Sequence, residues 1–218
     1  MSSRGSSCSR LILGATLLLL ACKDTTAPRV PGTMSARSAV TQAARAGTAV
    51  AESPAVLVLD QDAQPLGGVT VAFAVTAGGG TVTGSPATTD DAGVARLASW
   101  TLGSDGTTNV VRATVGSMST DFEATALVAA SLEIVSTQSQ QAKAGTQVPT
   151  APAVRVLDQN GQPLPGVTVS FAVITGGGTV SGASATTDAS GIARLASWTL
   201  GSDGTTNVVR ATVGSMST

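Results

Sequence analysis

The stretch GVTVAFAV, residues 68–75, decides the fold class of this chain. Its larger apolar side chains fall at every second position, namely Val69, Val71, Phe73 and Val75. A period of two is that of a β-strand with one buried face, whereas a helix needs apolar residues every three to four positions. The stretch therefore predicts a strand that points Phe73 into a core.

This strand belongs to a unit that occurs twice. The stretch returns as GVTVSFAV at residues 166–173, which places Phe171 at an offset of 98 residues from Phe73. Residues 95–120 recur at 193–218 without a single change. The body of the chain is therefore a tandem duplication of one unit of 98 residues.

Other strands of the unit follow from the same alternation. Val56 and Val58 are expected to face the core, because Leu57 between them is replaced by Arg155 in the second copy. We expect one strand over 94–101, which puts Trp100 and its copy Trp198 in or beside the core. Asp105-Gly106 predicts a hairpin turn into a strand over 109–115.

The last strand of the first unit is expected over 120–127. It places Phe122, Ala124 and Ala126 on one face. Each unit thus has about seven short strands with turn residues between them. This arrangement is typical of an immunoglobulin-like sandwich. We expect an all-β fold of two tandem immunoglobulin-like β-sandwiches, over residues 33–128 and 129–218.

The second unit stops at Thr218, the position equivalent to Thr120. We therefore expect the second sandwich to lack its last strand. The strand beside the gap, over 207–213, then has an open edge that invites pairing with a protein partner or a neighbouring copy.

The motifs also resemble a known family. The series V-x-V-x-D-Q-x-x-x-P-L-x-G-V-T-V-x-F-x-V, then G-G-G-T-V, T-T-D-x-x-G-x-A, W-x-L-G and V-x-A-T-V-G, resembles the group 1 bacterial immunoglobulin-like domain of invasin and intimin. The resemblance covers about residues 33–218 and implies a rod of stacked sandwiches that spaces another module from a membrane. It does not extend to the lectin-like domain that binds receptors in those proteins, so receptor binding is not implied.

The N-terminus predicts export. Two arginines and an apolar run of about ten residues form a signal peptide over 1–21. Residues 19–22, LLAC, resemble the bacterial lipobox, which implies lipidation of Cys22 and attachment to the cell membrane. Lys23 in place of an aspartate favours the outer membrane, if the organism is Gram-negative. Residues 22–32 contain two prolines and predict a tether.

The composition argues against catalysis. The chain has no histidine and no tyrosine, and its two cysteines, Cys8 and Cys22, lie in the first 22 residues. We expect no enzymatic activity, cofactor, metal or nucleic-acid partner, and a role as structural spacer or adhesion module. The alternative is a glycan- or calcium-binding lipoprotein, which would use Trp100 and Trp198, or the aspartates of the turns at 60–62 and 90–91.

Overall fold

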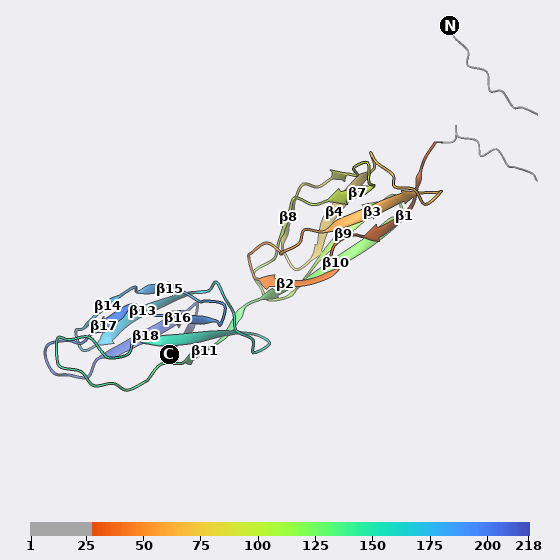
Figure 1. The fold of residues 1–218 in the computed structure, drawn as a ribbon. Helices are drawn as coiled ribbons and strands as arrows, with labels where there is room; N and C mark the ends of the chain where they lie inside the picture. The colour runs from red at the N-terminus through yellow and green to blue at the C-terminus, as the bar shows by residue number, and fades with distance from the viewer. Residues whose placement is uncertain (1–27) are drawn as a thin grey trace, which may run out of the picture.

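The computed structural model describes residues 28–218, and every regular element within that range is a β-strand (Figure 1). The first unit contains β1 (Pro31–Ala36), β2 (Thr41–Arg45), β3 (Ala55–Asp60), β4 (Thr70–Ala77), β5 (Thr81–Thr83), β6 (Ala87–Thr88), β7 (Val94–Arg96), β8 (Ser99–Thr101), β9 (Thr108–Val115) and β10 (Met118–Leu127). The second contains β11 (Ala129–Ile134), β12 (Ala153–Asp158), β13 (Thr168–Thr175), β14 (Thr179–Ser181), β15 (Ser184–Thr186), β16 (Ile192–Arg194), β17 (Ser197–Thr199), β18 (Val208–Val213) and β19 (Met216–Ser217). No helix within residues 28–218 is long and apolar enough to cross a membrane.

The first unit is a sandwich of two main sheets. One sheet has the order β1-β3-β7, and the other has the order β2-β10-β9-β4-β6. The short strands β5 and β8 pair separately along one side. Since β10 pairs antiparallel with β9 and parallel with β2, it is hydrogen-bonded along both edges.

The core lies between these sheets, where the alternating residues meet. Val71 and Phe73 of β4 face Val56 and Val58 of β3 across one apolar cluster, which confirms the predicted register. Trp100 is fully buried in the same cluster. The three predicted core residues of the last strand, Phe122, Ala124 and Ala126, are buried there as well.

Two local predictions are wrong. Residues 94–101 form two strands in place of one, since β7 pairs with β3 and β8 pairs with β5. Between them the chain crosses from sheet to sheet, and the Leu97 and Ala98 N–H groups bond to Pro54 and Thr83 carbonyls. Asp105-Gly106 is a turn, with Gly106 at a φ of 75°, but it is not a hairpin, because β8 and β9 do not pair with each other.

The second unit repeats this sandwich with one main difference. Its sheets have the orders β11-β12-β16 and β15-β13-β18-β19, with β14 and β17 paired at the side. The last strand, β19, has two residues, whereas its counterpart β10 has ten. Residues 139–143, which correspond to β2, are not a strand, because β2 pairs only with the part of β10 that has no counterpart here.

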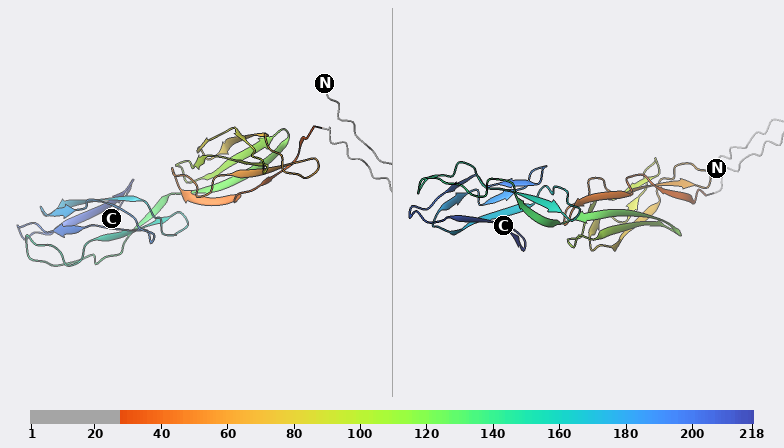
Figure 2. Two further views of the ribbon diagram at one scale, coloured as in Figure 1. Left: turned by 45° about the horizontal axis from the view of Figure 1, so that its top comes forward. Right: turned by 90° about the horizontal axis from the view of Figure 1, so that it is seen from below.

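The two sandwiches lie end to end, as the views in Figures 1 and 2 agree. Strand β10 of the first leads directly into β11 of the second, with Val128 alone between them. The start of β1 lies at the far end of the first sandwich from this junction (Figure 1).

Candidate functional site

Two of the aspartates considered for metal binding, Asp60 and Asp90, form hydrogen bonds within the turns in which they lie. The Asp60 carboxylate accepts hydrogen bonds from the backbone N–H groups of Asp62 and Gln64, at 2.9 and 2.8 Å. The Asp90 carboxylate likewise accepts from the N–H groups of Ala92 and Val94. Within residues 28–218, no group of three or more acidic, cysteine or histidine side chains is placed to hold a metal ion. Cys22, the predicted lipidation site, lies outside the described residues.

The first candidate site is the junction between the sandwiches. The side-chain amide of Gln159 accepts a hydrogen bond from the Val128 N–H at 2.9 Å and donates one to the Ala126 carbonyl at 2.9 Å. One residue of the second sandwich therefore bonds to the linker and to the end of β10. We call this pair of bonds the glutamine bridge.

Residues of the first sandwich also lie close to the junction. A Cβ added to Gly106 would lie 2.9 Å from Cγ2 of Val128, so the 105–106 turn packs directly against the linker. A Cβ added to Gly166 in the second sandwich would lie 3.5 Å from Nε of Arg45. The first sandwich therefore packs against the linker at Gly106, and its Arg45 lies next to Gly166 of the second sandwich.

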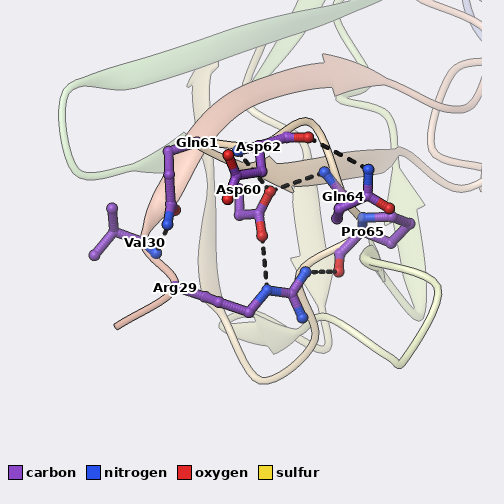
Figure 3. Close-up of polar contacts among 7 residues, drawn as sticks. All are labelled: Arg29, Val30, Asp60, Gln61, Asp62, Gln64 and Pro65. Atoms are coloured by element: carbon purple, nitrogen blue, oxygen red, sulfur yellow. Dashed lines mark hydrogen bonds and ion pairs between the residues drawn. The ribbon is translucent and has the colours of Figure 1, made fainter. Parts of the chain in front are cut away.

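One bond of the glutamine bridge has a counterpart at the opposite end of the first sandwich. Gln61 corresponds to Gln159, and its Oε1 accepts a hydrogen bond from the Val30 N–H at 3.0 Å (Figure 3). Val30 corresponds to Val128, since both pairs are separated by the repeat offset of 98 residues. The segment that enters the first sandwich thus makes the same valine-to-glutamine hydrogen bond as the linker that enters the second.

An ion pair reinforces this N-terminal joint. Nε of Arg29 donates to the Asp60 carboxylate at 2.6 Å, and Nη2 of Arg29 donates to the Pro65 carbonyl at 2.6 Å (Figure 3). The Gln64 backbone N–H, and after it the Arg29 guanidinium, hold the pKa of Asp60 below its usual value. At the junction between the sandwiches, Leu127 stands in the place of Arg29, so the joint there has no such ion pair.

The second candidate site is a groove of about 330 Å³ in the second sandwich. Its lining includes residues 136–140, Asn207, Val208 and Val209, together with Phe171 and Trp198. The prediction of core positions is confirmed for Phe73, Phe171 and Trp100, but Trp198 is only half-buried. It lies at the core edge because the strand that covers Trp100 in the first sandwich has no counterpart beside it.

The sequence prediction of an open edge located this groove, but it missed the glutamine bridge. The repeat itself contained a signal for the bridge, since D-Q follows the same strand in both units, at 60–61 and 158–159. A glutamine after a strand is ordinary in a turn, and only the structure shows that its side chain reaches the preceding linker.

No family model matches the sequence, and no curated protein matches it. Among solved structures, the chain is similar to the adhesin InvE of Yersinia pseudotuberculosis, at 21% identity and a TM-score of 0.40, over 85% of this chain and 57% of that one. It is also similar to the D0–D1 domain of intimin, at 21% identity and a TM-score of 0.30, over 85% and 92% of the two chains.

A third similar structure is invasin, a bacterial integrin-binding protein, at 20% identity and a TM-score of 0.39, over 83% of this chain and 36% of invasin. The chain thus spans little more than half of the InvE chain and about a third of invasin. By its own sheet order and strand pairing, the described chain is an all-β tandem of immunoglobulin-like sandwiches.

Proposed function

We propose that the chain is a non-enzymatic, lipid-anchored spacer at the bacterial cell surface, in which stacked sandwiches present an adhesion surface away from the membrane. The observation on which this rests is the joint between the sandwiches. Only Val128 separates β10 from β11, so few backbone dihedrals are free to bend there.

The glutamine bridge restrains these few dihedrals further. Gln159 bonds to Ala126 and Val128, which lie on either side of Leu127. Each such hydrogen bond contributes about 0.5–1.5 kcal/mol net. The two bonds together with the packing of Val128 against the 105–106 turn favour one orientation of the second sandwich over the others.

The repetition of the joint suits a spacer. In a stacked repeat protein, each unit contacts only its neighbours, and length is gained by adding units. Gln61 and Val30 form half of a joint on the end of the first sandwich that faces the tether. The same 98-residue unit therefore contains what is needed to stack on a unit before it and a unit after it.

The anchor predicted at Cys22 gives the rod its direction. The chain enters β1 at the end of the first sandwich opposite the junction, so lipidation of Cys22 would place the second sandwich distal to the membrane (Figure 1). Two or three acyl chains would make such attachment stable, whereas one is marginal.

The test is to lengthen the rod by one unit without changing either joint. A second copy of residues 30–127 is inserted between Leu127 and Val128. In the longer chain Val128 still follows a leucine and can still bond to Gln159, and the copied Val30 can bond to the copied Gln61. The protein is anchored in a supported bilayer, and its height is measured by atomic force microscopy. We expect the extended chain to stand higher by the length of one sandwich, and the Cys22→Ser form to be absent from the bilayer. An unchanged height would refute the spacer role.

A further inference from the structure

The linker at the junction is held by both sandwiches. On the side of the second sandwich, Gln159 bonds to the Val128 N–H and to the Ala126 carbonyl, each at 2.9 Å. On the side of the first, the Ala46 N–H donates to the Leu127 carbonyl at 2.8 Å, where β10 runs beside β2. The residue before Val128 is therefore fixed by the strand to which it belongs.

The segment that enters the first sandwich has fewer of these restraints. Val30 donates to Gln61, but among residues 28–218 Gln61 has no bond to the Pro28 carbonyl that would match the bond from Gln159 to Ala126. No strand precedes β1 in the part of the chain that the structure describes. One neutral hydrogen bond is a weak restraint by itself, so the order of this segment depends on another contact.

Arg29 makes that contact with both sides of its guanidinium. Nε donates to the Asp60 carboxylate and Nη2 to the Pro65 carbonyl, both at 2.6 Å (Figure 3). Because the guanidinium is planar, two bonds to fixed acceptors define its orientation as well as its position. We call these two bonds the arginine clamp.

The acceptor of the clamp is itself fixed. The Asp60 side chain is 2% exposed, and the oxygen that does not face Arg29 accepts from the N–H groups of Asp62 and Gln64. A carboxylate held in this way does not need to be ordered when Arg29 binds it. The restraint therefore falls on Arg29 and on the backbone that carries it.

The second sandwich shows that the turn forms without the arginine. Asp158 accepts from the N–H groups of Asn160 and Gln162 at 2.8 and 2.9 Å, as Asp60 does in its own turn. Leu127 stands in the place of Arg29, and its side chain packs against the apolar cluster of the second sandwich. Arg29 is thus not required for the turn, and its two bonds act on the entering segment instead.

We propose that the arginine clamp fixes the direction in which the N-terminal segment leaves the first sandwich, and so replaces the restraints that β10 gives to the linker at the junction. The inference deepens the spacer proposal and rests on it for its purpose, because a stiff rod keeps its orientation only if its base is also held. The clamp itself does not require that Cys22 is lipidated.

Amide hydrogen exchange, measured by NMR on the full chain, reads the two ends of the first sandwich separately. The Val30 and Val128 N–H groups each bond to a glutamine, one at the base and one at the junction. Arg29→Leu places at the base the residue type that Leu127 provides at the junction. We expect the protection factor of Val30 to fall by at least about tenfold, the loss that corresponds to one hydrogen bond to a charged group. Val128 should be unaffected, and Arg37→Leu, at an exposed arginine outside the clamp, should change neither.

The same change of aspartate in the two copies is the matched control. In Asp60→Asn the amide oxygen can still accept from the N–H groups of its turn, but the amide NH2 cannot accept from Arg29. Asp60→Asn should therefore lower the protection of Val30 as Arg29→Leu does, and keep that of Gln64. Asp158→Asn should leave Val128 unchanged, because no arginine stands before it.

The outcomes separate the clamp from the spacer. Unchanged protection of Val30 in both Arg29→Leu and Asp60→Asn would overturn the clamp. An equal loss at Val30 and Val128 would assign the effect to general destabilisation and would overturn it as well. Low protection of Val128 in the unaltered chain, with protection of Val30 that still depends on Arg29, would refute the stiff junction of the spacer and support the clamp.

Discussion

Phe122→Ala removes the largest side chain that β10 buries. Phe122 is 0% exposed, and its neighbours on the inward face are the small residues Ala124 and Ala126, which cannot extend into the vacated space. Backbone pairing of β10 with β9 on one edge and β2 on the other keeps the strand from collapsing inward. Because relaxation is limited in this way, we expect a loss of about 3–5 kcal/mol in the free energy of unfolding of the first sandwich.

A loss of this size is a large part of the total stability of a domain, about 5–15 kcal/mol. The assay is urea unfolding followed by Trp100 fluorescence, in a Trp198→Phe background so that one tryptophan reports on one sandwich. Glu123→Ala is the matched control, since Glu123 is the next residue of β10 and is exposed, and its change should stay within about 0.5 kcal/mol. A loss under about 1 kcal/mol for Phe122→Ala would refute the claim that β10 completes the core.

Two further predictions follow from single contacts, and a third follows from the lipobox. The pKa of Asp60 is lower in the folded chain than its unfolded value of about 3.9, so its contribution to stability is fully present above about pH 4 and is lost as the pH falls through the folded pKa. Asp60→Asn should therefore reduce the acid sensitivity of the first sandwich, measured by melting temperature between about pH 2 and 6. Arg112→Ala should lower the melting temperature of the first sandwich only slightly at low salt, because its ion pair with Asp121 is half-exposed, and the decrease should shrink in about 1 M salt. Cys22→Ser should abolish incorporation of a fatty-acid analogue, and unchanged labelling of the mutant would count against lipidation at Cys22.

The fold class and most of the core were predictable from the sequence because period-two alternation has a direct physical cause. Val56, Val71, Phe73 and Phe122 were assigned to the core from their register alone, and all are buried.

What the sequence did not predict depends on pairing between distant segments. Residues 94–101 alternate like one strand, but their backbone partners, β3 and β5, belong to different sheets, and local pattern contains no information on that choice. Trp198 has the same neighbours in sequence as Trp100, yet it is half-buried, whereas Trp100 lies in a buried cluster with Phe122 of β10, a strand whose counterpart β19 has only two residues. The glutamine bridge was missed for the same reason.

The most direct test of the spacer proposal is a distance distribution between the two sandwiches. Spin labels are attached to cysteines at the exposed turn positions Ala92 and Ala189, one in each sandwich, after Cys8 and Cys22 are changed to serine. Pulsed electron–electron double resonance should give one narrow distance peak in solution, and Gln159→Ala, which removes the glutamine bridge, should broaden it. A broad distribution in the unaltered chain, or one that Gln159→Ala leaves unchanged, would contradict a stiff joint.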